Sequence, residues 1–160
     1  MNIETIAVSE LSLDPSNVRK HSRRNLDAIK ASLRKFGQQK PIVVDAKGIV
    51  LAGNGTLTAA KELGWTEIQA TRTELAGVEA TAFAIADNRT AELAEWDDNL
   101  GDVLKSLQDA DVDLADLGYS ADDIAKMQTP DFAAGTVDDQ GKLDEKSPIE
   151  CPHCHKSFTP

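Results

Sequence analysis

The chain has 160 residues, 41% of them hydrophobic and 28% charged, which favours one globular domain with appendages. No apolar run approaches the ~20 residues of a membrane-spanning helix, and the N-terminus lacks the basic start and apolar stretch of a signal peptide. These features exclude a membrane protein, and we expect a cytoplasmic one.

The net charge of −10 is divided unevenly along the chain. The first 72 residues carry +4 and the remainder −14, and residues 19–40 hold eight basic side chains but one acid, Asp27. Such asymmetry predicts a basic face that contacts DNA and an acidic C-terminal part, with a merely solvated helix face as the alternative. The candidate DNA-binding residues are Arg23, Arg24, Lys30, Arg34 and Lys35.

The first elements in chain order are a strand, a helix and a β-hairpin. Residues 3–13 read as a short strand and its exit, closed by turn residues at 14–17. Apolar residues recur at helical spacing over 26–36, with Ser22 or Asn25 as the N-cap and Gly37 just after the last turn. Two β-branched runs, 41–44 and 48–52, are joined by a hairpin connection.

The second half reads as mainly helical. After Gly53-Asn54-Gly55 a helix begins near Thr56, and a strand follows at 68–73. Apolar spacing predicts helices over 78–93 and 100–107, and residues 120–123 resemble a capping box that opens a last short helix. The aliphatic core is expected to be completed by two tryptophans, Trp65 and Trp96.

The Gly53-Asn54-Gly55-Thr56 turn is a candidate phosphate site. Two glycines permit positive φ and close backbone approach, and the helix behind them presents free N–H groups to an anion. The hydroxyls of Thr56 and Thr58 would add donors. A tight strand-to-helix connection is the alternative, and the Gly-Lys-Ser/Thr ending of a Walker A loop is missing.

Three separated motifs resemble the ParB/sulfiredoxin-like domain in order and spacing. They are NVR at 17–19, FGQQKPIVV at 36–44 and LAGNGTLTAAKELG at 51–64. The resemblance covers about residues 3–96, and the later residues look like a subgroup from phages and mobile elements that occurs alone or joined to DNA methyltransferases. It implies an α+β fold, a small mixed β-sheet with packed helices, followed by a helical C-terminal part.

With this resemblance the chain divides into four segments. We expect a ParB-like domain at 1–96, a helical extension at 97–127, a flexible linker at 128–147 and a zinc-knuckle-like tail at 148–160.

The resemblance also implies a pocket for CTP or ATP with Mg²⁺. In the family the Gly-rich turn wraps the phosphates, and the segment before Pro-Ile lies near the base and ribose. A Glu-Asn pair of the family helps to hold the metal, and Asp87-Asn88 stands in a similar place here. The implied nucleotide-binding residues are Gly53, Asn54, Gly55, Thr56, Thr58, Gln38, Gln39, Pro41 and Arg19.

The turn departs from the family in its side chains. ParB turns usually read Gly-Glu-Arg-Arg, whose arginines clamp phosphates, whereas this turn has Asn54, Gly55 and Thr56. The catalytic residue remains unknown, because the acid of kinase-like relatives is missing. Sulfiredoxin chemistry is excluded, since the turn contains neither the cysteine nor the arginine that it requires.

Both cysteines lie in the last ten residues. Cys151 and Cys154 form a Cys-Pro-x-Cys knuckle that would grip Zn²⁺ with His155 or His153 as a third ligand. A second chain would complete the tetrahedron and give a zinc-linked homodimer. A flexible tail and a redox dithiol are the alternatives.

Three functions follow. The first is a phage or mobile-element nucleotide- or phosphate-binding module that acts in DNA binding or processing. The second is an enzyme, a Mg²⁺-dependent nucleotide hydrolase or nuclease that uses Asp87 and Asn88. The third is an accessory subunit that positions a separate DNA methyltransferase.

Overall fold

The computed structural model of the chain describes residues 2–128 and 148–158. The chain divides into two compact units, with the boundary directly after Gln128. The predicted linker at 128–147 lies outside the described residues, apart from Gln128.

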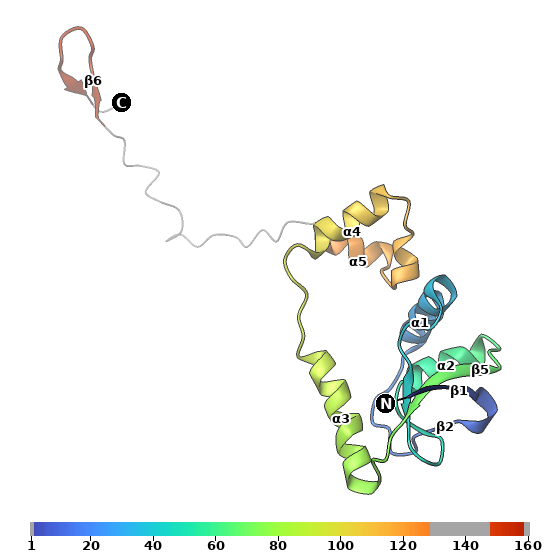
Figure 1. Cartoon of the computed structure of the whole chain (residues 1–160). Helices are drawn as coiled ribbons and strands as arrows, with labels where there is room; N and C mark the ends of the chain where they lie inside the picture. The colour runs from blue at the N-terminus through green and yellow to red at the C-terminus, as the bar shows by residue number, and fades with distance from the viewer. Residues whose placement is uncertain (1, 129–147, 159–160) are drawn as a thin grey trace. The chain divides into compact units, whose positions relative to one another are not determined.

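A five-stranded mixed sheet forms the centre of the first unit (Figure 1). In the order β1-β5-β3-β4-β2, the pairs β1/β5 and β3/β4 are antiparallel, and β5/β3 and β4/β2 are parallel. This is the α+β fold with a small mixed sheet that the sequence predicts. The strands are β1 (Ile3–Ala7), β2 (Ser12–Leu13), β3 (Ile42–Val44), β4 (Ile49–Ala52) and β5 (Glu67–Arg72).

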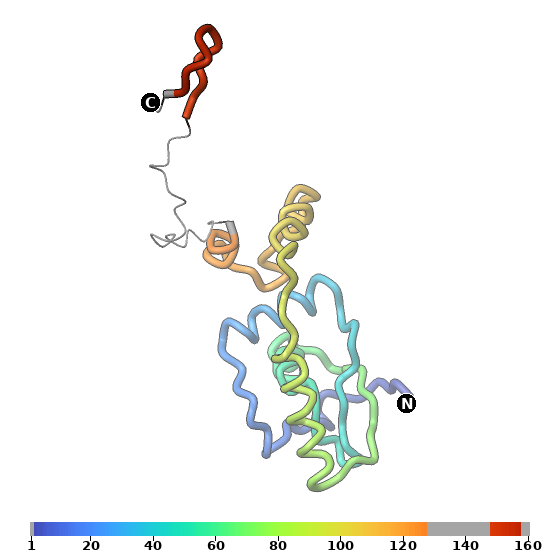
Figure 2. Tube along the Cα trace, turned by 90° about the vertical axis from the view of Figure 1, so that its left-hand side faces the viewer, coloured from blue at the N-terminus to red at the C-terminus, as the bar shows by residue number. Residues whose placement is uncertain are grey.

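Helices lie against this sheet and continue beyond it. Helix α1 packs on α2, α3 packs on β4, and η2 packs on α1 (Figure 2). Within the described ranges, no helix is both long enough and apolar enough to cross a bilayer. The helices are η1 (Val8–Glu10), α1 (Arg23–Phe36), α2 (Asn54–Glu62), α3 (Gly77–Glu92), α4 (Leu100–Asp109), η2 (Leu114–Leu117) and α5 (Ala121–Gln128).

Local capping explains where two of these helices begin. At α1, the Ser22 hydroxyl accepts a hydrogen bond from the Asn25 amide at 3.2 Å, so Ser22 is the N-cap. At α5, the Asp123 carboxylate accepts from the Ser120 amide at 2.8 Å, and the Ser120 hydroxyl accepts from the Asp123 amide at 3.3 Å. This reciprocal pair is the predicted capping box.

The core is aliphatic, as the low aromatic content predicts. Trp65 packs against it, but Trp96 is 78% exposed, so the prediction that Trp96 fills the core is wrong. Helix α3 buries Ala80 alone among its residues, and its C-terminal end therefore brings no core surface to Trp96. The core residues are Ile6, Val8, Leu11, Ile42, Val44, Val50, Leu57, Ala60, Ile68 and Ala70.

A buried lysine fastens α1 to α2. The Lys30 side chain is 9% exposed, and its Nζ lies 2.7 Å from Glu62 Oε2 and 2.8 Å from Asp27 Oδ1. The hydrogen bond from Lys30 lowers the pKa of both carboxyl groups, and the bond to Asp27, followed by that to Glu62, raises the pKa of Lys30. The lysine thus packs the interface with its stem, and its charge together with that of Arg23 balances the two acids.

We expect this cluster to make the fold acid-sensitive. Because the carboxyl pKa values are lowered on folding, their stabilising effect is present above the ordinary values of about 4 and is lost as the pH falls through the folded-state values. The raised pKa of Lys30 adds a loss only in strongly alkaline solution. Glu62→Gln should lower the urea midpoint at neutral pH and make its decline between pH 5 and 3 shallower. Glu95→Gln, at an exposed position without a described partner, should leave that decline unchanged; equal slopes in all three proteins would contradict the assignment.

The second unit contains a short hairpin. Strands β6 (Ile149–Glu150) and β7 (Ser157–Phe158) pair antiparallel, and the two cysteines lie in the connection between them.

Candidate nucleotide-binding pocket

The glycine turn places an uncapped helix N-terminus at the end of β4. Gly53 is the N-cap of α2 with φ of 100°, a left-handed conformation that favours glycine, and no side chain caps the helix. The first-turn amides of Asn54, Gly55 and Thr56 have no carbonyl partner within the helix. They are therefore available to an anion, as the sequence predicts.

Both glycines are also required by close packing. A Cβ on Gly53 would lie 2.5 Å from Ile42 Cγ2, and a Cβ on Gly55 would lie 2.7 Å from Cε1 of His21. The His21 ring therefore rests on the first turn of α2, and its Nδ1 is 2.7 Å from Asn25 Oδ1. Glycine at these positions lets β3 and the imidazole approach the turn.

The turn's polar side chains differ in their availability. Asn54 is 8% exposed, and both ends of its side-chain amide form hydrogen bonds. Oδ1 accepts from the Asp14 backbone amide at 3.1 Å, and Nδ2 donates to the Val50 carbonyl at 2.9 Å. The Thr58 hydroxyl donates to the Asn54 carbonyl. Asn54 and Thr58 thus hold the turn together, and Thr56 lines the pocket.

A cavity of about 260 Å³ opens in front of this turn. Its walls come from the loop before α1, from β3 and β4, and from α3, so the fold gathers residues that lie far apart in the sequence. Arg19, His21 and Lys40 contribute cationic or imidazole groups, and Asp87 contributes a carboxylate. The lining residues are Asn17, Arg19, His21, Ile29, Lys40, Pro41, Ile42, Val43, Leu51, Ala52, Gly53, Asn54, Gly55, Thr56, Asp87 and Asn88.

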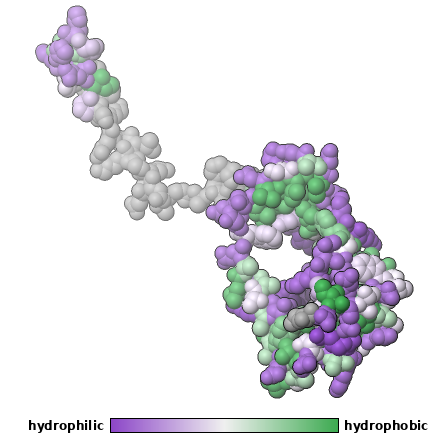
Figure 3. Space-filling view, in the orientation of Figure 1, coloured by the Kyte–Doolittle hydropathy of each residue, from purple (hydrophilic) through white to green (hydrophobic). Residues whose placement is uncertain are grey.

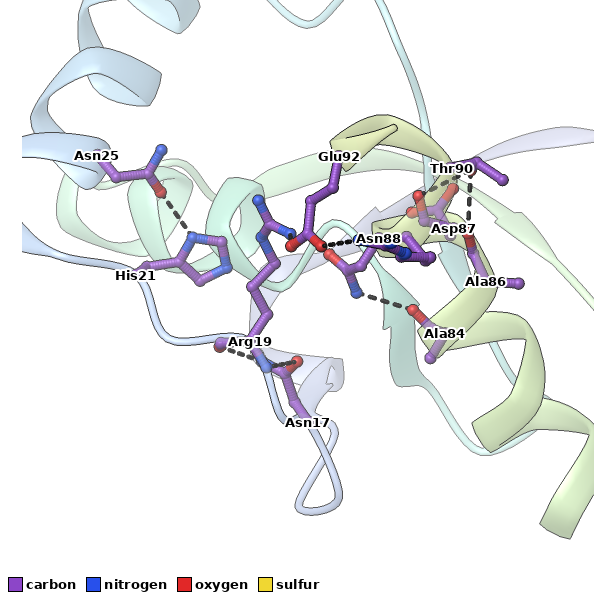
Figure 4. A network of polar contacts seen from close by, with 11 residues as sticks. Asn17, Arg19, His21, Asn25, Ala84, Ala86, Asp87, Asn88, Thr90 and Glu92 are labelled. Carbon is purple, nitrogen blue, oxygen red and sulfur yellow. Dashed lines mark hydrogen bonds and ion pairs between the residues drawn. The ribbon is translucent and has the colours of Figure 1, made fainter. Parts of the chain in front are cut away.

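Polar contacts join the loop to α3 beside this cavity (Figure 4). Asn17 Oδ1 accepts from the Arg19 amide at 3.0 Å, which fixes the loop, and the Arg19 guanidinium lies 2.6 Å from Glu92 Oε1. One turn earlier, Asn88 Nδ2 donates to the Ala84 carbonyl, so its Oδ1 keeps its acceptor capacity next to Asp87.

A second cavity of about 410 Å³ adjoins the first, because both are lined by Ile29, Lys40 and Thr56. It contains Gln38 and Gln39, which the resemblance assigns to the base and ribose end. The Gln38 side chain is bound to both backbone groups of Gln69 at 2.8 Å. The two cavities together fall within the range of about 300–1,000 Å³ that is typical of small-ligand sites.

The predicted metal ligands are only partly assembled. Asp87 and Asn88 lie together at the cavity, but no three His, Cys, Asp or Glu side chains form a metal-holding group among the described residues. In the tail hairpin, His155 Nδ1 lies 2.9 Å from Glu150 Oε1 and does not join the two cysteines in such a group.

The surroundings of the Cys151 thiol lower its pKa. Backbone amides of His153 and Cys154 donate to it, and the Cys154 thiol approaches it; these contacts, in that order, lower the pKa of Cys151. The turn therefore stabilises a thiolate at this position.

Ion pairs engage most of the predicted DNA-binding residues. Arg24 pairs with Asp123, Lys35 lies 3.1 Å from Asp116, and Arg23 contacts both Asp27 and Glu62. These arginine and lysine side chains are 45–70% exposed, and no described residue pairs with Arg34. Lys30 is different: it is buried between α1 and α2, and this placement does not support its predicted contact with DNA.

Comparison with known sequences decides the family. The sequence model of the ParB N-terminal domain matches residues 1–89. The chain belongs to the ParB N-terminal domain family. The ParB-like nuclease domain-containing protein YnaK of Escherichia coli (strain K12) is 36% identical over 56 residues, which are 35% of this chain and 64% of YnaK. The chain therefore spans less than two thirds of that curated relative.

A solved structure shows the same fold. The C-terminally truncated chromosome-partitioning protein ParB from Caulobacter crescentus, complexed with CTP-gamma-S, superposes with a TM-score of 0.67 and 18% identity, over 79% of this chain and 77% of that one. The same protein complexed to the centromeric parS site gives a TM-score of 0.47 at 18% identity, over 78% and 69%.

Two pocket residues of this ParB-like domain were not predicted from the sequence. His21 is half-buried against Gly55 and lines the pocket. Lys40 lines both cavities and has no ion-pair partner among the described residues. Their positions, close after Arg19 and directly before Pro41, are the signals that would have indicated them.

Proposed function

We propose that the chain is a nucleoside-triphosphate-binding module that acts on DNA, with the nucleotide in the pocket before α2. The observation that carries this proposal is the convergence of Arg19 and His21, from the loop before α1, and Lys40, from the segment before β3, on an uncapped helix N-terminus. Helix dipole and free amides favour an anion there, and the three side chains add positive or hydrogen-bonding groups. They compensate for the arginines that this turn lacks.

Each wall of the pocket has a role in this proposal. The amides of residues 54–56 and the Thr56 hydroxyl bind phosphate oxygens, and Arg19 and Lys40 balance their charge. Asp87 and Asn88 supply oxygen ligands to a Mg²⁺ ion that accompanies the phosphates. The adjoining cavity at Gln38 and Gln39, together with Pro41 on the wall of the first cavity, takes the ribose and base. The Caulobacter ParB complex contains a CTP analogue, which makes CTP the first nucleotide to test.

The DNA contact is assigned to the exposed cations of α1. Exposed ion pairs are worth only about 0–1 kcal/mol, so Arg23, Arg24 and Lys35 can exchange their carboxylates for DNA phosphates. Arg34 needs no exchange, because no described residue pairs with it. Binding of this kind is independent of base sequence and falls with salt.

Binding is preferred over the enzymatic alternatives. Two-metal hydrolysis needs a cluster of carboxylate or imidazole ligands, and the described residues bring no three such side chains together. Asp87 and Asn88 suit a Mg²⁺ that arrives with a nucleotide.

A two-variant crossover tests both parts of the proposal. Lys40→Ala should abolish the rise in melting temperature that CTP with Mg²⁺ gives the wild type, because ligand binding to the folded state alone raises stability. It should leave retention on heparin unchanged. Arg34→Ala should elute from heparin at lower salt and keep the full CTP shift, since its side chain lies outside both cavities.

Lys47→Ala, in the exposed β3–β4 connection, is the matched control and should change neither property. If CTP, ATP and GTP all fail to stabilise the wild type at millimolar concentration, nucleotide binding is wrong. If Arg34→Ala elutes with the wild type, α1 is not the DNA-binding surface.

A further inference from the structure

His21 has an unused ring nitrogen at the N-terminus of α2. A Cβ built on Gly55 would lie 2.7 Å from Cε1 and 3.0 Å from Nε2 of His21, so the ring rests on the first turn of the helix. The other nitrogen, Nδ1, is 2.7 Å from Asn25 Oδ1 (Figure 4). Nε2 forms no hydrogen bond with any residue that the structure describes, and the side chain lines the cavity in front of the glycine turn.

The contact with Asn25 determines which ring nitrogen carries the proton. The oxygen of a side-chain amide only accepts hydrogen bonds, so Nδ1 of His21 donates to Asn25 Oδ1. In the neutral imidazole Nε2 is then an acceptor with a lone pair, whereas in the protonated imidazole it is an N–H donor. The lone pair repels an anion at the α2 N-terminus, and the N–H group binds one.

The charge of His21 is therefore coupled to an anion in the pocket. Histidine is the only side chain that ordinarily changes its charge between about pH 5 and 8. A hydrogen bond from a protonated imidazole to phosphate is about twice as strong as one between neutral groups. Because the protonated form binds the anion better, the anion favours uptake of a proton, and its affinity must fall as the pH rises.

No other histidine belongs to the unit that contains the pocket, since the remaining two are His153 and His155. The first turn of α2 carries no charged side chain. The charged side chains of the other segments around the ring are Arg19 and Lys20 in the loop, Arg23 and Arg24 in the first turn of α1, Lys40 before β3, and Asp87 and Glu92 in α3. These are arginine, lysine and carboxylate groups, so the pH dependence between 6 and 8 is assigned to His21.

We propose that His21, positioned by Asn25, is a phosphate-binding residue that makes the affinity of the pocket depend on pH. In its protonated form Nε2 donates to a phosphate oxygen beside the free amides of α2. As the pH rises the proton leaves to solvent, and the same nitrogen presents a lone pair to the phosphate. This proposal rests on the proposed nucleotide site and adds the residue that regulates it.

The affinity for CTP with Mg²⁺, measured between pH 6 and 8 in the wild type and in His21→Gln, tests the role of His21. The terminal phosphate of CTP also titrates in this range, but its contribution is common to both proteins. The wild type should lose about tenfold more affinity than His21→Gln, which corresponds to the difference between a charged and a neutral hydrogen bond. Calorimetry near pH 7 in two buffers of different ionisation enthalpy should show extra proton uptake on binding in the wild type.

Asn25→Asp tests the positioning role separately. A carboxylate keeps the hydrogen bond from Nδ1 and favours the protonated imidazole, so the fall in CTP affinity should move to higher pH by about one unit or more. An acidic residue in the first turn of α1 suits the helix dipole, and the variant should fold. Asn99→Asp is the matched control, because it adds the same charge at the exposed N-cap of α4, and its pH profile should equal that of the wild type.

Two results would overturn the proposal and leave nucleotide binding intact. The first is an equal pH dependence in the wild type and His21→Gln. The second is an Asn25→Asp profile that coincides with the wild-type profile. If CTP does not bind the wild type at any pH between 6 and 8, the nucleotide site itself is wrong and this proposal fails with it.

Discussion

Replacing Gly53 by alanine should destabilise the fold by about 2–5 kcal/mol. Two effects add. A left-handed residue with a Cβ costs about 1–2 kcal/mol, and Gly53 has φ of 100°. Overpacking costs about 1–3 kcal/mol, and the new Cβ would lie 2.5 Å from a methyl group of Ile42, which is 2% exposed and cannot move aside. Urea unfolding followed by circular dichroism measures the loss.

Gly64→Ala separates these two effects. Gly64 also has a left-handed φ, 74°, but no heavy atom lies within 4 Å of its added Cβ. This variant should lose only the backbone part, about 1–2 kcal/mol. If Gly53→Ala and Gly64→Ala lose the same stability, the contact between the glycine turn and β3 is looser than the structure indicates.

Asn54→Ala should cost about 2–4 kcal/mol of stability without removing a nucleotide ligand. The substitution leaves the Asp14 amide without its side-chain acceptor and removes a donor from the Val50 carbonyl. Each buried group left without a partner costs about 1–3 kcal/mol. Because the side-chain amide of Asn54 binds these groups and the backbone amide is kept in the variant, the affinity for CTP, measured well below the melting temperature, should change little.

Asn88→Ala is the matched control for stability. Its Nδ2 also donates to a carbonyl four residues earlier, Ala84, but that carbonyl belongs to a continuous helix with its own amide donors. We expect a loss below about 0.5 kcal/mol, typical of a surface substitution. An Asn54→Ala protein that keeps its stability but no longer binds CTP would show that Asn54 is a ligand after all.

Local patterns predicted most of the secondary structure and the location of the pocket. The apolar stripe of 26–36 with Ser22 and Gly37, the 45–48 connection and the Ser120–Asp123 box depend on neighbouring residues, and all formed as expected. These features have a sequence period, a turn rule or a capping rule that acts within a few neighbouring residues. The Gly-rich turn and Asp87-Asn88 also meet in one cavity, and for Asp87-Asn88 it was the family resemblance that indicated the pocket.

The features that the sequence alone did not indicate depend on partners that lie far away in the sequence. Lys30 looks like any other cation of a basic helix until Glu62 is placed beside it. The Asn54 side chain looks like a phosphate ligand until the loop at Asp14 is folded over it, which leaves its backbone amide for that role. Trp96 is a large aromatic residue of the kind expected in a core, but it finds no surface to pack against. Figure 3 shows that hydrophobic side chains also reach the surface of the segment that carries α4 and α5, where Val103 and Met127 are 49% and 45% exposed.

The strand pairing has a consequence for the order in which the pocket is built. β3, β4 and α2 follow one another closely in the chain, whereas the pairing of β1 with β5 brings Ile3 opposite Thr71. Contacts between distant residues form late, because the entropy of closing the long loop is lost before the contacts stabilise it. We therefore expect the glycine turn and the α2 amides to be assembled early. The loop with Arg19 and the α3 residue Asp87 pack against this part later. The backbone amides proposed to bind phosphate are therefore in place before the charged side chains of the pocket.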